Sequence, residues 1–213
     1  MSISKISVGL DGTLASSQEA VVEDLNNEFR EELRSNGQIF SYLGIKDKYD
    51  WGKIYREYGI TSDECYDRIY EKWRTDSSQI DSIDLSFDME RGFENLYERF
   101  NVDIVTRNPY TEEIKNWLED AYIFEGEHYD NIVSIYGEEK RKGQMDYDFF
   151  IDDDPNIIKD LGTHQGLFLR SRSYNRKVDH RIGPVMYRMN SLLETSEILV
   201  SWDKKLEKVE GDR

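Results

Sequence analysis

Two acidic segments of the sequence each follow directly after a short apolar run. Asp11 lies within residues 8–14 (VGLDGTL), and the run 152–154 (DDD) follows the apolar residues 149–151. If these apolar runs are parallel strands, the carboxylates lie at the strand ends where open α/β sheets bind ligands. Adjacent carboxylates repel one another unless a cation lies among them, and oxygen ligands favour Mg²⁺. The pattern predicts a Mg²⁺ or acid–base site. The alternatives are an ordinary strand-to-turn junction at Asp11 and a solvated acidic loop at 152–154.

A hydroxyl side chain and a lysine fit a phosphate site beside these carboxylates. Thr106 ends the apolar run 102–105 and is followed by Arg107. The Thr106 hydroxyl, with the backbone N–H groups that follow it, could hold a phosphate oxygen. Lys142 precedes the second acidic run, where its ammonium group would neutralise anionic charge. For Thr106 alone, a strand end with a polar cap is the competing interpretation.

Short apolar runs alternate with longer helical patterns, which predicts an α/β domain with a doubly wound, mainly parallel sheet. More than ninety residues separate the first two expected strands, whereas a crossover needs only about a dozen. We therefore expect a small helical cap at residues 16–87, inserted after the first strand, and a core formed by residues 1–15 and 88–213. The expected strands are residues 3–8, 102–106, 131–136, 149–151 and 166–169.

Two capping signals indicate helices inside the insert. Ser16 with Glu19, and Thr61 with Glu64, have the spacing of a capping box. Residues 88–100 predict the helix that leads into the second strand. The many aromatic residues of the insert are interpreted as packing of the cap, or alternatively as a lining for a flat ring.

The charge of the chain argues against several partners. Asp and Glu number 44 and Lys and Arg 28, which gives a formal charge of −16 over 213 residues. Nucleic acid polymers and anionic membranes are themselves negative, so neither is expected as a partner. The single cysteine, Cys65, excludes an intrachain disulfide, and His128, His164 and His180 lack metal-ligand spacing. Without an apolar run of about 18 residues or a signal peptide, a soluble cytoplasmic protein is expected.

The order of the motifs resembles the haloacid dehalogenase superfamily of phosphohydrolases over residues 3–175. Within the superfamily, the sequence is most similar to the cytosolic and mitochondrial type of 5′(3′)-deoxyribonucleotidase. Lys142 lies ten positions before Asp152, and residues 150–155 (FIDDDP) and 173–175 (SYN) are similar to segments of that group. The resemblance implies a doubly wound core with a cap, Mg²⁺ as cofactor, a phosphate monoester such as a 5′-(deoxy)nucleotide as substrate, and a homodimer.

The resemblance also implies a role for each matching residue. Asp11 would be the general acid that protonates the leaving oxygen, and its backbone carbonyl would bind Mg²⁺. Asp153 would be a direct Mg²⁺ ligand, and Asp152 either a ligand or a group that orients one. Lys142, with Lys140 as the alternative lysine, would hold the phosphoryl group. The candidate residues are Asp11, Asp152 and Asp153 for the metal, Thr106, Lys142 and Arg107 for phosphate, and Asp11 with position 9 for catalysis.

Gly9 stands where the family has its nucleophile. The family mechanism needs a carboxylate two positions before the general acid, which attacks phosphorus and forms an aspartyl-phosphate. Glycine cannot do this and removes a metal ligand as well. The chain is then an engineered or chance variant of an active enzyme, a natural pseudo-enzyme, or an enzyme that uses attack by a metal-bound water. The expected function is Mg²⁺-dependent hydrolysis of a 5′-nucleotide. The alternatives are a non-catalytic nucleotide- or phosphate-binding or structural protein, and another substrate such as a sugar phosphate.

Overall fold

The computed structural model describes residues 3–29, 59–139, 141–172, 175–176 and 186–211. Within these residues, six parallel strands form one sheet in the order β3-β2-β1-β4-β5-β6. The predicted α/β fold with a parallel sheet is therefore confirmed. The strands are β1 (Lys5–Gly9), β2 (Asn101–Thr106), β3 (Asn131–Ser134), β4 (Phe149–Asp152), β5 (Gly166–Arg170) and β6 (Met186–Met189).

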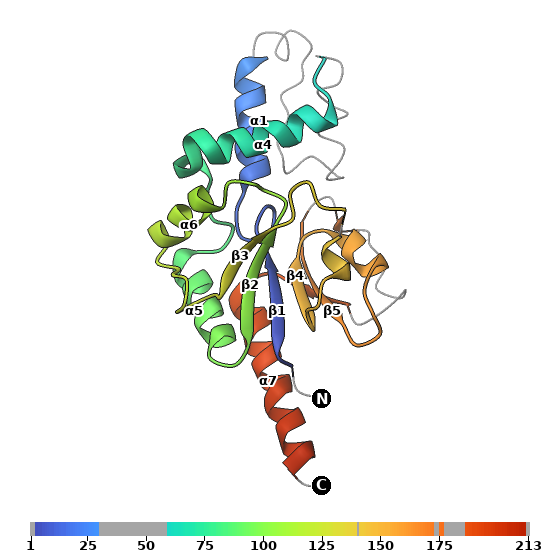
Figure 1. Cartoon of the computed structure of the whole chain (residues 1–213). Helices are drawn as coiled ribbons and strands as arrows, with labels where there is room; N and C mark the ends of the chain where they lie inside the picture. The colour runs from blue at the N-terminus through green and yellow to red at the C-terminus, as the bar shows by residue number, and fades with distance from the viewer. Residues whose placement is uncertain (1–2, 30–58, 140, 173–174, 177–185, 212–213) are drawn as a thin grey trace.

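Helices connect these strands and extend the molecule beyond both ends of the strands. Helices α1 and α4 lie beyond the carboxyl ends of the strands, whereas β1 begins and α7 ends at the opposite end (Figure 1). Helices α5 and α7 pack against each other. The helices are α1 (Ser17–Glu28), α4 (Ser62–Asp76), α5 (Ser86–Tyr97), α6 (Thr111–Asp120) and α7 (Leu192–Gly211), with short 3₁₀ turns η3 (Ser77–Gln79), η4 (Lys142–Gln144) and η5 (Pro155–Lys159).

The central strands are apolar because the sheet is covered on both faces. All five residues of β5 are buried, as are the last five of β2, which is usual for parallel strands between helices. The strand β6 was not expected from the sequence. Only Met189 of its four residues is buried, so this edge strand carries little of the apolar signal that marks the others.

The order of the strands reverses between β1 and β4. Chain order runs outward from β1 through β2 to β3 on one side and from β4 through β5 to β6 on the other. Such a switch point opens a crevice at the carboxyl ends of the two central strands, where ligands bind in folds of this type. The acidic motifs that follow β1 and β4 therefore lie on the two sides of this crevice.

One of the two capping predictions is confirmed and the other is wrong. Thr61 begins α4, and its side-chain oxygen accepts the backbone N–H of Glu64 at 3.1 Å. Helix α1 follows Ser16 as expected, but the Ser16 hydroxyl donates to the carbonyl of Asp81 at 2.7 Å and forms no cap. Glu19 pairs with Arg172 instead of completing a capping box. Tertiary partners therefore replace the local cap at this end of α1.

The chain leaves the sheet region and returns to it along neighbouring paths. Ala15 and Ser82 form an antiparallel bridge, and the backbone N–H of Ser16 donates to the Asp81 carbonyl at 2.9 Å. Ala15 is next to the predicted start of the insert at residue 16, and Ser82 lies five residues before its predicted end at residue 87. The division into core and cap remains a prediction.

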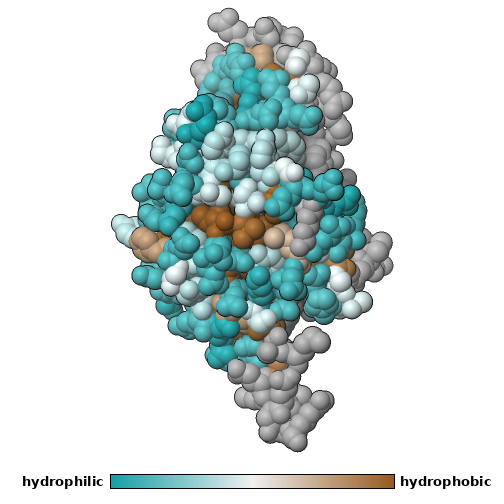
Figure 2. All heavy atoms as spheres, viewed as in Figure 1, coloured by the Kyte–Doolittle hydropathy of each residue, from teal (hydrophilic) through white to brown (hydrophobic). Residues whose placement is uncertain are grey.

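The surface and the helices of the described residues agree with the charged composition. Hydrophilic residues cover most of the face in Figure 2, with a hydrophobic area below helices α1 and α4. Within the residues described here, no helix is both long and apolar enough to cross a membrane.

Candidate active site

A tight turn after β1 sets the direction of Asp11. The carbonyl of Leu10 accepts the N–H groups of Thr13, Leu14 and Ala15, and the N–H of Gly12 donates to the Ala15 carbonyl. Gly12 has a φ of 79°, a left-handed conformation that costs glycine little and other residues more. The turn carries Asp11 out of the buried strand to the rim of the crevice.

The Asp11 carboxylate is held by partners from three elements. Its Oδ1 accepts a hydrogen bond from the Ser17 hydroxyl at 2.5 Å and from the indole N–H of Trp73 at 2.8 Å. Its Oδ2 lies 3.4 Å from the Thr106 hydroxyl at the end of β2. Trp73 belongs to α4 and packs edge-on against Trp117. The position of α4 is therefore linked directly to the orientation of Asp11.

Thr106 is fixed in turn by the loop that follows it. Its hydroxyl oxygen accepts the backbone N–H of Asn108 at 3.0 Å, and the Thr106 side chain is buried. The structure thus places Thr106 beside Asp11. Arg107, the next residue, is exposed and lines the same cavity.

At the end of β4, Asp152 pairs with the predicted lysine. Lys142 Nζ donates to Asp152 Oδ2 at 2.7 Å, and the backbone N–H of Asp154 donates to Asp152 Oδ1 at 2.9 Å. The Asp152 side chain is 4% exposed and that of Lys142 17%. Lys142 therefore reaches the acidic run, and the alternative lysine, Lys140, lies outside the described residues.

Asp153, the next residue, contacts the turn after β1. Its Oδ1 is 3.4 Å from the Thr13 hydroxyl, and its carbonyl accepts the Asn175 side-chain amide at 2.9 Å. Asn175 also donates to the carbonyl of Arg170, so it ties the ends of β4 and β5 together. This contact gives a structural role to the last residue of the segment 173–175.

The space beside Gly9 is filled by the Asp152 carboxylate. A Cβ atom at Gly9 would lie 2.3 Å from Asp152 Oδ2, 2.8 Å from Asp152 Cγ and 3.0 Å from the Thr13 hydroxyl oxygen. Real Cβ atoms do not approach other atoms closer than about 3 Å, so any side chain at position 9 must displace Asp152. Gly9 therefore makes room on β1 for a carboxylate from the neighbouring strand.

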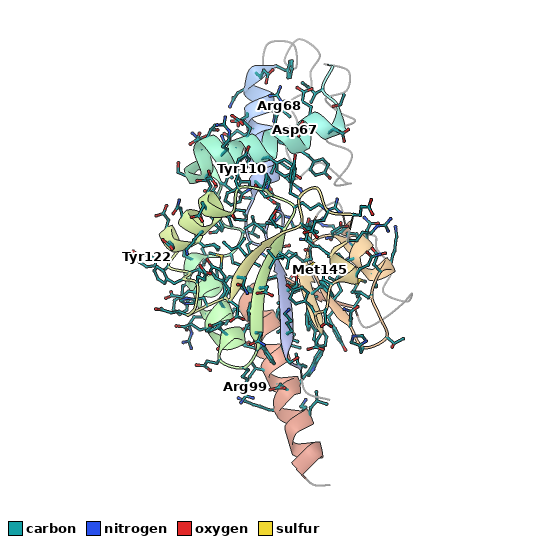
Figure 3. The ribbon with its side chains drawn as sticks, in the orientation of Figure 1. Asp67, Arg68, Arg99, Tyr110, Tyr122 and Met145 are labelled. Carbon is teal, nitrogen blue, oxygen red and sulfur yellow. The ribbon has the colours of Figure 1, made fainter. Side chains whose placement is uncertain are left out.

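A cavity of about 780 Å³ lies between these strand ends and α4. Asp67 and Arg68, labelled in Figure 3, mark the part of α4 that lies beyond the sheet. Asp67, Tyr66 and Tyr70 line the α4 side of the cavity. Burial, and then the negative charge of Asp11, raise the pKa of the Tyr70 phenol, so this group is a neutral hydrogen-bond donor at neutral pH.

The donor set of the cavity fits a hard divalent cation. Asp11, Asp152 and Asp153 all line it, and Lys142 pairs with Asp152. Carboxylate and carbonyl oxygens are the ligands that Mg²⁺ prefers. The predicted metal residues therefore lie together, and the concentration of negative charge there favours a bound cation.

Sequence reasoning missed the residues that hold Asp11. Ser17 and Trp73 belong to the expected insert and show no motif of their own. Trp73 is one of the aromatic residues of the insert that the sequence leaves as packing of the cap or as lining for a flat ring, and its ring is fully buried. Its hydrogen bond to Asp11 depends on how α4 lies across the sheet edge, which spacing along the chain does not encode.

A second group of ionisable side chains joins α5 to the loop before β3. Glu90, Glu94 and the buried His128 bring one ligand atom each within 4.8 Å of one another. This grouping was not predicted, because the spacing of His128 in the sequence is not that of a metal ligand. Its Nδ1 accepts the backbone N–H of Phe124 at 3.1 Å, which leaves the proton of the neutral ring on Nε2. In this tautomer Nε2 has no free lone pair for a metal.

The parallel sheet with its flanking helices has a haloacid-dehalogenase-like α/β fold, as the structures it matches show. No protein-family model matches the sequence, and no curated protein matches it. A structure described as a predicted phosphatase from Clostridium acetobutylicum matches with a TM-score of 0.62 and 15% identity, over 94% of this chain and 100% of that chain. The HAD-hydrolase YfnB from Bacillus subtilis, solved with bound magnesium, matches with a TM-score of 0.50 and 16% identity. The match covers 93% of this chain and 99% of that chain.

The same fold also carries a different named activity. Protein tyrosine kinase A from Mycobacterium tuberculosis matches with a TM-score of 0.55 and 14% identity, over 93% of this chain and 98% of that chain. Identities this low establish the fold alone, and the reaction has to be argued from the site.

Proposed function

We propose that this chain is a Mg²⁺-dependent phosphate-monoester hydrolase that acts on a 5′-(deoxy)nucleotide. The convergence of Asp11, Thr106, Lys142 and Asp153 on one cavity at the switch point carries the proposal. A carboxylate acid, a hydroxyl donor, an ammonium group and a cation-binding carboxylate are the groups that phosphoryl transfer requires. The resemblance further implies a homodimer in the cytoplasm, and both remain predictions.

The phosphoryl group would be bound by Lys142 and Thr106. Lys142 supplies positive charge from η4, and Thr106 supplies a hydroxyl from the end of β2. Mg²⁺, when bound, would neutralise further phosphoryl charge, and Asp153 with the backbone carbonyl of Asp11 would hold it. Arg107 at the cavity rim adds a second cation for the phosphate.

Asp11 would act as the general acid. Ser17 and Trp73 both donate to Oδ1, so the proton to be transferred belongs on Oδ2, the oxygen beside Thr106. From this atom it can pass to the leaving oxygen of the substrate. The large cavity supports a nucleoside as the leaving group, because Tyr66 and Tyr70 on α4 offer aromatic faces to a base.

Gly9 favours a second candidate function. Without a carboxylate on β1, the same cavity could bind a nucleotide with Mg²⁺ and not hydrolyse it. In that case the groups that recognise phosphate remain and the reacting group is absent.

Phosphate release from a panel of 5′-deoxynucleotides and sugar phosphates, with Mg²⁺ or with a chelator, tests the proposal. We expect Mg²⁺-dependent release that favours the nucleotides. Asp11→Asn should lower the rate at least about 100-fold, because a general acid contributes about that much. Nucleotide binding without release supports the second candidate, and preference for a sugar phosphate contradicts the nucleotide class.

A further inference from the structure

We propose that Asp152, on β4, supplies the attacking carboxylate that position 9 of β1 lacks. The inference rests on the proposed function, because it concerns the same phosphoryl site. It starts from the geometry at Gly9, where a Cβ atom would lie 2.3 Å from Asp152 Oδ2. The Asp152 carboxylate thus fills the volume into which a side chain at position 9 would project.

The register of the sheet explains how one strand can replace the other. Val8 of β1 pairs with Ile151 of β4, so Gly9 and Asp152 are the next residues on adjacent parallel strands. Side chains in register on neighbouring strands point to the same face. A carboxylate from either strand can reach this volume, but the two cannot share it.

Asp152 is oriented and charge-compensated as a nucleophile must be. The backbone N–H of Asp154 holds Oδ1 at 2.9 Å, and Lys142 holds Oδ2 at 2.7 Å. Asp152 lines the cavity although its side chain is 4% exposed. Because Lys142 touches Oδ2, a phosphoryl group bound by Lys142 would lie next to this oxygen.

The resulting reaction has two steps, and water is its only co-reactant. Oδ2 of Asp152 forms a bond to phosphorus while the bond from phosphorus to the leaving oxygen breaks, and that oxygen takes the proton of Asp11. Water then attacks the aspartyl-phosphate at phosphorus and gives a proton to Asp11, which releases phosphate and restores the Asp152 carboxylate. Asp153 keeps its role at the cation, so the two neighbouring carboxylates have separate tasks.

Chemical trapping of the intermediate tests this assignment. The full chain is mixed with dTMP and Mg²⁺, quenched in acid and treated with borohydride, which reduces an aspartyl-phosphate to homoserine. Tryptic cleavage separates residues 143–159, which contain Asp152, from residues 6–30, which contain position 9 and Asp11. Fragmentation of these peptides identifies the modified position. We expect homoserine at residue 152.

Matched variants make the result decisive. Asp152→Asn should abolish the label and lower turnover at least about 1,000-fold, as losses of nucleophiles do, while dTMP binding persists. Asp146→Asn, an exposed change outside the cavity, should leave both unchanged. Gly9→Asp combined with Asp152→Gly returns the carboxylate to β1 and should move the label to residue 9.

The outcomes separate this inference from the proposed function. Turnover with the label at another residue overturns the role of Asp152 and leaves hydrolysis intact. The same holds if the turnover rate of Asp152→Asn is within about tenfold of the rate of the unchanged chain. Binding of dTMP without turnover by the unchanged chain also overturns it and leaves a nucleotide-binding protein. Neither binding nor turnover overturns the proposed function itself.

Discussion

Replacement of Gly9 by alanine should destabilise the protein, although the same change elsewhere in a strand would help it. Gly9 ends β1 with no positive φ, so alanine would normally gain about 0.4–1 kcal/mol by restricting the unfolded chain. Here the added Cβ lies 2.3 Å from Asp152 Oδ2 and 2.8 Å from Asp152 Cγ. Either the Asp152 side chain moves off Lys142 or the strands separate. Loss of the charge-assisted hydrogen bond between Asp152 and Lys142 costs about 1–3 kcal/mol.

We therefore expect Gly9→Ala to lower the free energy of unfolding by about 1–3 kcal/mol. For a chain of this size, that corresponds to a decrease in melting temperature of about 2–12 °C. Urea denaturation and calorimetry measure both quantities without metal or substrate.

A double-mutant cycle isolates the contact responsible. In an Asp152→Gly background the obstacle is gone, and Gly9→Ala should become neutral or stabilising by up to about 1 kcal/mol. Equal effects of Gly9→Ala in the two backgrounds, or stabilisation in the unchanged chain, would show that Asp152 does not fill the space beside Gly9. Such a result would also remove the geometric basis for the role of Asp152 in attack.

Three further predictions concern the support of the site and the core. Trp73→Phe keeps a ring on α4 but removes the N–H that donates to Asp11 at 2.8 Å. The rate of phosphate release should therefore fall about 10–100-fold, and an unchanged rate would contradict the role of this hydrogen bond. Arg170→Ala breaks an ion pair with Asp84 in which both side chains are 6% exposed. Urea denaturation should show that the free energy of unfolding falls by about 3–5 kcal/mol. A decrease below about 1 kcal/mol would contradict the burial of the pair. Burial raises the pKa of the Cys65 thiol from 9.0 to about 11, so iodoacetamide at pH 8 should leave the folded chain unmodified. Because the unfolded thiol ionises first, stability should fall as pH rises from 9 to 11, and Cys65→Ala should remove that part of the decline; an identical pH profile in both proteins would contradict it.

The sheet and the ends of its central strands were predictable because buried parallel strands have a strong apolar signal. Strands β1, β2, β4 and β5 lie within a residue or two of the expected ranges. The acidic turn after β1 and the run after β4 come directly after these strands, so their meeting at one edge follows from the topology. β6 was missed because an edge strand with one buried residue lacks that signal.

The interactions that complete the site were not predictable because they join residues distant in sequence. Trp73 reaches Asp11 from α4 across 62 positions, and Ser16 bonds to Asp81 instead of capping its own helix. The sequence shows that Gly9 lacks a carboxylate, but only the register of β1 and β4 shows that Asp152 fills its place. Local patterns thus locate the reactive groups, and tertiary packing decides which of them face one another.

Calorimetric titration of the full chain with dTMP tests the central claim, a phosphate site at the switch point, most directly. We predict that dTMP binds in the presence of Mg²⁺ and that thymidine, which lacks the phosphate, binds much more weakly. Lys142→Ala should weaken dTMP binding at least about tenfold, since a charge-assisted hydrogen bond contributes about 1.5–3 kcal/mol. Lys204→Ala, an exposed change on α7, serves as the matched control and should have no effect. Equal affinity for thymidine and dTMP, or unchanged binding by Lys142→Ala, would contradict the account.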